Sequence, residues 1–299
     1  LPTSKPLRTW LSSLVDVEQV HVGAGSKWVD PAATLSTRLT GSLEEALDAL
    51  ETQVPVAQDT DWLNAWTQAD RTVAHAITAP LSEVGLSEVG LSEAGLSDAG
   101  LSEPAVITAL AQFLPPTATL FVGASMPIRD VEEFFPVLQD PPRVLANRGA
   151  NGIDGTVATA LGVKAASDGE VVLLLGDVTF THNLGALLAL RRHKRKLTIV
   201  LLNNRGGGIF NFLPVSSAAE AFERHIATPP ELDFSRAAEL YGAEHVAVAD
   251  LDGFTTALLN ALAGDHTTLI EVPGDRGANR RLHAEVEAAA LASLRSSSS

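Results

Sequence analysis

Short runs of apolar residues alternate with longer amphipathic segments from residue 102 to the end of the chain. Most of the runs consist almost wholly of Val, Ile and Leu, such as residues 171–175 and 197–202. Such runs indicate parallel strands that are buried on both faces. The pattern predicts a doubly wound α/β domain over residues 102–299, with ligands bound at the carboxyl ends of the strands. The expected strands are 119–122, 144–146, 171–175, 197–202, 245–248 and 268–272, and the expected helices include 156–166, 183–193, 235–240 and 253–263.

Residues 1–79 are predicted to form a separate, smaller unit. The pattern indicates an amphipathic segment at 6–14, a short strand at 19–22 and two helices. The first helix begins at a capping box, because Ser42 stands three residues before Glu45 and opens an apolar-periodic run. The second helix is expected over residues 61–77, with Trp62, Trp66 and Val73 facing a core.

A pentapeptide repeat, LSEVG LSEVG LSEAG LSDAG, occupies residues 81–100. A five-residue period does not match the helical period, and a glycine in every repeat disfavours helix. We expect a flexible linker over residues 80–101 that joins the two units.

The composition is that of a folded protein, with 45% hydrophobic and 19% charged residues. The sequence contains no apolar run of the roughly 18 residues that span a bilayer, so we expect no membrane partner. It contains no cysteine, which excludes disulfides, thiolate metal sites and cysteine nucleophiles and fits a reducing cytoplasm. A metal bound by this chain must therefore have oxygen or histidine ligands.

The formal net charge of −15 disfavours a nucleic-acid or anionic-membrane partner, because the long-range field has the wrong sign. An anionic ligand would need local help from a metal ion, a few positioned Arg or Lys side chains, or helix N-termini. The sequence begins at Leu1, and its only methionine is Met126. We therefore expect a trimmed or partial product, and we identify no targeting peptide.

Polar residues follow two of the predicted strands at the point where each strand ends. Gly176 and Asp177 follow the run VVLLL, and Asn203 and Asn204 follow the run LTIVLL. Asp177 and Asn204 are 204 − 177 = 27 residues apart, which is enough for a helix and a return strand, so the two strand ends can lie at one edge of the sheet. A carboxylate, an amide oxygen and a nearby backbone carbonyl would suit a hard divalent cation such as Mg²⁺.

Glycines surround these two polar positions. Gly176, Gly206, Gly207 and Gly208 would let the main chain approach a diphosphate closely, and the helix N-terminus that begins at Asp177 would add its dipole. The sequence lacks the lysine-containing pattern of a P-loop and the glycine pattern of a dinucleotide fold. Taken singly, Gly-Asp and Asn-Asn are also ordinary turn residues at strand ends.

The Gly-Asp and Asn-Asn pairs at this spacing resemble the cofactor motif of thiamine-diphosphate (ThDP) enzymes. The resemblance implies that Asp177 and Asn204 are side-chain ligands of Mg²⁺, with Mn²⁺ as the alternative metal, and that Gly206 is the carbonyl ligand. It also implies that Val178 and Thr179 contact the diphosphate. The cofactor set that follows from it is Ser125, Ile153, Gly176, Asp177, Val178, Thr179, Asn204, Gly206, Gly207 and Ile209.

Four successive blocks are similar to the 2-succinyl-5-enolpyruvyl-6-hydroxy-3-cyclohexene-1-carboxylate (SEPHCHC) synthase family of the menaquinone pathway. They read LFVGASMPIRD, ANRGANGIDGTVATALG, GDVTFTHNLGALL and NNRGGGIFNFLP and span residues 120–214. Residues 1–79 resemble the end of that family's middle domain more weakly. Members decarboxylate 2-oxoglutarate on ThDP and join the resulting succinyl semialdehyde unit to isochorismate, which implies these two small-molecule partners.

The resemblance also implies a substrate pocket. Ser125, Arg129 and Arg148 correspond to pocket residues, and arginine binds carboxylates in a bidentate fork, which suits two polyanionic substrates. Lys5 corresponds to a basic pocket residue. Ile209, Phe210 and Leu213 correspond to its apolar wall. Ile153 corresponds to the residue that supports the bent conformation of ThDP, although plain core packing after a Gly-Asn-Gly turn is the alternative.

Two departures from the family are visible. The chain has His182-Asn183 where the family commonly has His-Asp, and we expect His182 to be a capping or packing residue without a catalytic role. The glutamate that activates ThDP lies on an N-terminal pyrimidine-binding domain, so no catalytic residue is assigned in these 299 residues. We therefore expect the polypeptide alone to be inactive and to need that domain, or a homo-oligomer that provides it.

Two alternatives remain open at this point. A related ThDP carboligase such as an acetohydroxyacid synthase would use the same cofactor motif, but the paired arginines at 129 and 148 favour a multiply anionic substrate. A noncatalytic remnant would still bind diphosphate and metal.

Overall fold

The computed structural model describes residues 5–23, 30, 32–52, 60–81, 101–147, 152–193 and 195–297. The chain divides into two compact units, Leu1–Gln68 and Ala69–Ser299. The sequence pattern set the boundary at residue 79, whereas the compact units divide within one helix, α3 (Thr60–Leu81). Almost all of the pentapeptide repeat, residues 82–100, lies outside the described residues.

The first unit contains a small parallel pair of strands with helices. Its elements are α1 (Lys5–Ser13), β1 (Val20–Val22), β2 (Thr37–Leu39), α2 (Leu43–Glu51) and the start of α3. The predicted capping box is confirmed, because the Ser42 side chain accepts the Glu45 N–H and the Glu45 side chain accepts the Ser42 N–H. Both N-terminal donors are thereby satisfied.

The prediction that Trp62 and Trp66 face a core was wrong. Trp62 is 67% exposed and Trp66 52% exposed. Their rings instead lie against each other, with centroids 5.9 Å apart, and Trp66 also meets Trp10 of α1 at 6.3 Å. Helical spacing shows which residues share a face, but it cannot show what covers that face.

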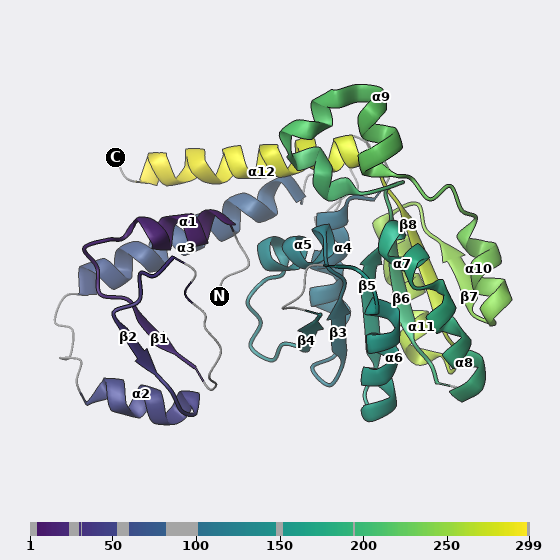
Figure 1. Ribbon diagram of the computed structural model, residues 1–299, viewed down its shortest axis with the longest axis horizontal. Coiled ribbons are helices and arrows are strands. Elements are labelled where there is room, and N and C mark those ends of the chain that lie inside the picture. The colour runs from purple at the N-terminus through teal and green to yellow at the C-terminus, as the bar shows by residue number, and fades with distance from the viewer. Residues whose placement is uncertain are drawn as a thin grey trace. The chain divides into compact units, whose positions relative to one another are not determined.

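The second unit is built on a six-stranded, wholly parallel sheet (Figure 1). The strand order is β4-β3-β5-β6-β8-β7, and every neighbouring pair is parallel. All six predicted strands are confirmed, with ends shifted by at most one residue. Their bounds are β3 (Thr119–Val122), β4 (Arg143–Ala146), β5 (Val171–Gly176), β6 (Thr198–Asn203), β7 (Glu244–Ala247) and β8 (Thr268–Pro273).

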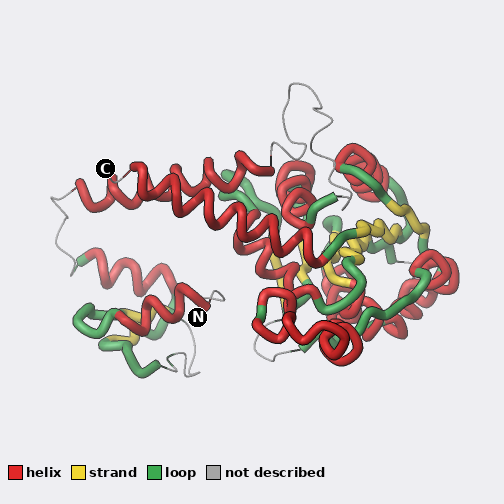
Figure 2. The backbone as a smooth tube through the Cα atoms, turned by 90° about the horizontal axis from the view of Figure 1, so that it is seen from above, coloured by secondary structure: helices red, strands yellow, loops and turns green. Residues whose placement is uncertain are grey.

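Helices cover both faces of this sheet, as the doubly wound prediction required. Seen from above, they lie on either side of the strands (Figure 2). The principal helices are α4 (Glu103–Phe113), α5 (Met126–Phe134), α6 (Thr156–Ala166), α7 (Asp177–His182), α8 (Leu188–His193), α10 (Phe234–Tyr241), α11 (Leu251–Ala263) and α12 (Arg276–Ser297). Shorter helical turns are η2 (Leu184–Leu187), η3 (Gly208–Phe212), η4 (Pro214–Ala218), α9 (Ala219–Phe222) and η5 (Glu223–Ala227).

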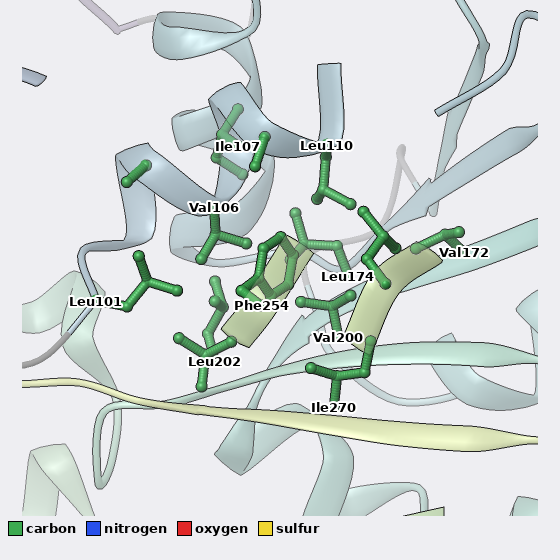
Figure 3. Close-up of a cluster of buried hydrophobic side chains, with 14 of the residues drawn as sticks. Leu101, Val106, Ile107, Leu110, Val172, Leu174, Val200, Leu202, Phe254 and Ile270 are labelled. Atoms are coloured by element: carbon green, nitrogen blue, oxygen red, sulfur yellow. The ribbon is translucent and has the colours of Figure 1, made fainter. Parts of the chain in front are cut away.

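Alternate residues of the central strands enter two separate cores. Val172 and Leu174 of β5 pack on the face that carries α4 and α11 (Figure 3), whereas Leu173 and Leu175 pack on the face that carries α6 and α10. Side chains alternate across a strand, so a strand buried on both faces must be apolar throughout. This requirement explains the continuous Val, Ile and Leu runs of the sequence.

The strand order reverses beside β5. The chain passes from β3 outward to β4, then returns to the other side of β3 to form β5. The connections that leave the carboxyl ends of β3 and β5 therefore diverge and leave a crevice between them. The residues that follow β3, β5 and β6 consequently define the place to look for a ligand.

Candidate diphosphate and metal site

Asp177 is fixed at the carboxyl end of β5, where it begins α7. Its Oδ1 accepts the N–H of Val178 at 2.8 Å, and its Oδ2 accepts the N–H of Gly206 at 2.7 Å. The side chain is almost fully buried, at 1% exposure. Burial raises the pKa of this carboxyl to about 6 despite the two backbone N–H groups, which favour the ionised form. A cation beside it would offset that cost.

Asn204 lies at the carboxyl end of the neighbouring strand, β6. Gly176 pairs in register with Leu202, so the two polar ends meet at the same edge of the sheet, as expected from the sequence. The Asn204 Nδ2 donates to Glu103 Oε1 at 2.7 Å. Its Oδ1 is buried without a hydrogen-bond partner among the described residues, which leaves an amide oxygen available to a cation.

The loop after Asn204 contains one position, Gly206, whose backbone conformation only glycine adopts without strain. Gly206 has a φ of 133°, and a Cβ there would lie 2.6 Å from the carbonyl oxygen of Ala227. Arg205, just before it, has a φ of 62°. The N–H of Gly207 then donates to the Ala227 carbonyl at 2.7 Å. The loop is therefore held against the chain near residue 227 while Gly206 turns its N–H toward Asp177.

A small cavity of about 30 Å³ lies between these strand ends. That volume is on the order of one water molecule or one ion. Gly176, Val178 and Thr179, which the family resemblance assigns to the cofactor, lie in its wall. The full lining is Glu103, Ser125, Met126, Pro127, Gly176, Asp177, Val178, Thr179, Leu202, Asn204, Gly206, Gly207 and Gly208.

Ser125 reaches the same cavity from the carboxyl end of β3. It precedes α5 with a φ of 82° and a ψ of −133°, and its side chain makes no capping hydrogen bond. A non-glycine residue in this region is strained, and such strain concentrates at ligand sites. Arg129, one turn later and exposed, donates from Nη1 to the Ser125 carbonyl. The structure thus brings Arg129 to the residue that joins β3 to the cavity.

Ile153 is connected to the site through Asn183. The Asn183 Nδ2 donates to the Ile153 carbonyl at 3.0 Å and to the Thr179 carbonyl at 2.7 Å. The amide thereby ties the loop before α6 to α7, a role that the sequence analysis missed when it considered only His182. His182 itself is largely exposed, with its Nδ1 3.7 Å from the Asp154 Oδ1.

The proposed apolar wall is partly open to solvent. Phe210 is 38% exposed and Leu213 is 48% exposed, while Ile209 is half-buried. This segment therefore presents apolar side chains at the surface. Exposed apolar patches of this kind are typical of surfaces that another molecule covers.

Two predicted substrate residues cannot be placed. Arg148 lies outside the described residues, together with the Gly-Ala-Asn segment that follows it. Lys5 begins α1 in the first unit, but its side chain is not described.

Behind the cavity lies a buried group of ionisable side chains that the sequence analysis did not identify. Glu103, the first residue of α4, is 4% exposed, and burial together with the charge of Asp130 raises its pKa to about 8. Burial also raises the pKa of Asp130. His283 of α12 places Nε2 3.3 Å from Asp130 Oδ1 and Nδ1 3.3 Å from Glu133 Oε2. Burial lowers the pKa of His283, but the two acids more than compensate and raise it to about 9.

Two features are absent from the described residues. No group of three or more His, Cys, Asp or Glu side chains is arranged to hold a metal within the described ranges. The candidate set of one carboxylate, one amide and one carbonyl is of a different kind. None of the helices in the described part of the chain combines the length and apolar character needed to cross a membrane.

Comparison with protein families and curated proteins gave consistent matches. Residues 128–272 match the family of thiamine pyrophosphate enzymes, C-terminal TPP binding domain; thiamine pyrophosphate is another name for ThDP. Over 284 residues the chain is 35% identical to the SEPHCHC synthase of Listeria monocytogenes serotype 4b (strain F2365), covering 95% of this chain and 46% of that protein. Over 286 residues it is 38% identical to the SEPHCHC synthase of Geobacillus kaustophilus (strain HTA426), with the same coverage. The chain spans about half the length of the curated relatives it matches.

Solved structures match more distantly. A thiamin diphosphate-dependent 4-hydroxybenzoylformate decarboxylase of Rhodococcus jostii RHA1 has a TM-score of 0.60 and 23% identity, covering 86% of this chain and 44% of that one. A putative thiamin diphosphate-dependent enzyme of Mycobacterium smegmatis has a TM-score of 0.58 and 21% identity, covering 86% and 43%. At these identities the likeness supports the fold alone.

Proposed function

We propose that this chain provides the diphosphate-binding and metal-binding half of a SEPHCHC synthase. The chain belongs to the thiamine-diphosphate-dependent enzymes and is similar to SEPHCHC synthases over 95% of its length. The complete activity would be the decarboxylation of 2-oxoglutarate and the addition of the succinyl semialdehyde unit to isochorismate in menaquinone biosynthesis. This activity places the protein among the transferases.

One observation carries the proposal. Asp177 and Asn204 follow adjacent parallel strands and line one cavity of about 30 Å³. Within this cavity, the Asn204 Oδ1 is buried without a hydrogen-bond partner among the described residues. The Asp177 carboxyl is also buried, and it forms no ion pair with a basic side chain in the described part of the chain. An unpaired buried oxygen beside a buried carboxylate costs free energy that a bound divalent cation would recover.

The residues present fit a magnesium-bound diphosphate. Asp177 and Asn204 would bind Mg²⁺, or Mn²⁺, through side-chain oxygens, and Gly206 would bind it through its carbonyl. Val178 and Thr179 lie in the first turn of α7, where backbone N–H groups favour phosphate. Gly176 and Gly207 would let the diphosphate approach the main chain.

When bound, ThDP supplies the carbanion that both the decarboxylation and the carbon–carbon bond formation require. The protein's own side chains hold and enclose it. Ile153, fixed through its carbonyl to Asn183, would support the middle of the cofactor. Ile209, Phe210 and Leu213 would form an apolar wall that excludes water from the reacting atoms.

The substrate groups are anions, and Arg129 is a matching cation next to the cavity. It is exposed, and its guanidinium donates to the carbonyl of Ser125, which lines the cavity. Its guanidinium would leave the Ser125 carbonyl to bind a substrate carboxylate in a bidentate fork. Arg148 and Lys5 are assigned to the same pocket on family resemblance.

The pyrimidine end of ThDP needs a second partner. The chain spans about half the length of its curated relatives. We infer that the activating glutamate comes from a pyrimidine-binding domain outside these 299 residues, brought to the site within the same protein, in a homo-oligomer or by a separate polypeptide. The exposed Phe210 and Leu213 would then be covered by that domain.

Product formation from 2-oxoglutarate and isochorismate, with ThDP and Mg²⁺, tests this proposal. We expect the 299-residue polypeptide by itself to form no cyclohexene product, and to gain activity when a pyrimidine-binding domain from a similar synthase is added. Pyruvate offered in place of 2-oxoglutarate tests for an acetohydroxyacid-type carboligase. Full turnover by the polypeptide alone, or a preference for pyruvate, would contradict the proposal.

A further inference from the structure

The amide of an asparagine presents a donor and an acceptor of nearly the same shape. Only Oδ1 can bind a cation, and a half-turn about the last side-chain bond would put Nδ2 in its place. Asn204 therefore serves best as a metal ligand if a neighbouring group fixes the orientation of its amide before the cation arrives. A fixed amide spares the cation the free-energy cost of ordering it.

We propose that Glu103 is a positioning residue for metal binding, whose carboxyl oxygen holds the Asn204 Nδ2 so that Oδ1 faces the metal cavity. This inference rests on the proposed function, since it concerns the same metal site. Glu103 does not itself bind the metal; it acts through Asn204.

The contact between the two residues supports this assignment. Nδ2 of Asn204 donates to Oε1 of Glu103 at 2.7 Å, and the two residues are 101 positions apart in the sequence. The reversed amide would place Oδ1 against an Oε1 that carries no proton, which puts two acceptors at hydrogen-bond distance. Oε1 can accept the N–H when the carboxyl group is ionised or when its proton is on Oε2.

Glu103 is itself held in place. It is the first residue of α4, next to the N-cap Ser102, whose Oγ accepts the Ala105 N–H at 3.2 Å. Pro104 follows it with a restricted backbone. The helix behind it is anchored in the core by Val106 and Leu110, which are fully buried (Figure 3). The acceptor therefore stands on a rigid element rather than on a loop.

The burial of a carboxyl group here also needs an explanation. An exposed acid at the start of a helix is favourable without any partner, but Glu103 is 4% exposed and stands near the buried Asp130. Two neighbouring buried acids cost free energy. Such a cost is typical of functional sites, and orientation of Asn204 is the benefit that the contacts indicate.

Three variants separate orientation from simple packing. Glu103→Leu removes the acceptor, whereas Glu103→Gln keeps an acceptor oxygen and can donate to Asp130 with its new N–H₂ group. Val106→Ala, on the same helix and buried away from the cavity lining, is the matched control for lost stability. Manganese binding to the 299-residue chain with ThDP, measured by the electron paramagnetic resonance signal of free Mn²⁺, gives the dissociation constant without any assay of activity.

We expect Glu103→Leu to weaken Mn²⁺ binding about 10-fold to 100-fold, the usual effect of losing a group that orients a ligand. Glu103→Gln should stay within about threefold and Val106→Ala should leave binding unchanged, because neither loses the acceptor. Tight binding by a folded Glu103→Leu protein, or equal losses in the Gln and Leu variants, would overturn the proposal. If the leucine variant does not fold, Glu103→Ala takes its place.

A second background gives a stricter test. Asn204→Asp makes the two side-chain oxygens equivalent, so no orientation is needed, and Glu103→Leu should then cost no metal affinity and should relieve repulsion between acids. An undiminished loss in this background would show that Glu103 acts through general structure and would overturn the proposal. Absence of any Mn²⁺ binding by the unmodified chain with ThDP would instead refute the proposed function on which this inference rests.

Discussion

The carboxylate of Asp177 accepts the backbone N–H of Gly206 over 2.7 Å. This bond joins the loop after β5 to the loop after β6 before any metal binds. The proposed carboxylate ligand and the proposed carbonyl ligand are therefore already next to each other. A preorganised site of this kind loses little entropy when a cation arrives.

Replacement of Asp177 should abolish magnesium-dependent ThDP binding. Asp177→Ala removes the only carboxylate in the proposed ligand set, so the metal should bind poorly. Without the metal, nothing offsets the repulsion between the diphosphate and a chain of net charge −15. His182→Ala is the control, because that histidine is largely exposed and its Nδ1 lies as far as 3.7 Å from the Asp154 Oδ1. Titration calorimetry with ThDP and Mg²⁺ measures both variants. Equal losses in the two would show that His182 has a role we have not assigned.

Gly206→Ala should disrupt the loop that carries the third proposed ligand. A Cβ at this position would lie 2.6 Å from the Ala227 carbonyl oxygen, and the φ of 133° is strained for any other residue. We expect a loss of about 1 to 3 kcal/mol in the free energy of unfolding and a weaker response to Mg²⁺.

Gly185→Ala is the matched control for this substitution, since an added Cβ there meets nothing within 4 Å and the φ is not positive. Urea unfolding of both variants gives the comparison. A Gly206→Ala protein as stable as the Gly185→Ala protein would mean that the loop adapts without strain.

The buried histidine behind the site should make stability depend on pH. The pKa of His283 is raised to about 9 by Asp130 and Glu133 against the opposing effect of burial. Because the folded pKa lies above the unfolded value, the stabilisation is fully present below about pH 6.5 and is lost as the pH rises through 9. It amounts to at most roughly 3 kcal/mol.

The variant His283→Gln isolates this effect. Relative to the unmodified chain, we expect this variant to lose the most free energy of unfolding near pH 6. The loss should shrink by pH 9.5, because the folded and unfolded pKa values of His283 differ by ~2.5 units. His182→Gln, at an exposed position, should give a small deficit throughout. Urea unfolding across this range is the measurement, and a constant deficit for His283→Gln would refute the assigned ion pair.

The sheet and the main site residues could be predicted from the sequence because each depends on local pattern. Strands buried on both faces must be continuous in Val, Ile and Leu, and polar residues such as Asp177 and Asn204 stand out where those runs end. Adjacent strand ends then follow from the short right-handed connection between them. No contact beyond the strand, helix and strand unit was needed.

Contacts between distant residues were missed. An acid at the first position of a helix, such as Glu103, is indistinguishable in sequence from an ordinary exposed helix start, and Asp130 and His283 meet only because α5 and α12 pack together. The helix expected over 183–193 is divided into η2 and α8. The Asn183 side chain at the start of this segment bonds to the carbonyls of Ile153 and Thr179, and the first of these contacts joins residues 30 positions apart. The opposite error was made for Trp62 and Trp66. Their helical spacing predicted burial in a core, but both side chains are exposed.

The most direct test of the account is the position of the metal. Crystals of the chain grown with ThDP and Mn²⁺ would locate the ion by anomalous diffraction, and a matched Mg²⁺ structure would give the bond lengths. The account predicts one ion between β5 and β6, bound by Asp177, by the Asn204 Oδ1 and by the Gly206 carbonyl, at about 2.0 to 2.1 Å for Mg²⁺. An ion bound elsewhere, or ThDP bound with its diphosphate away from these two strand ends, would contradict it.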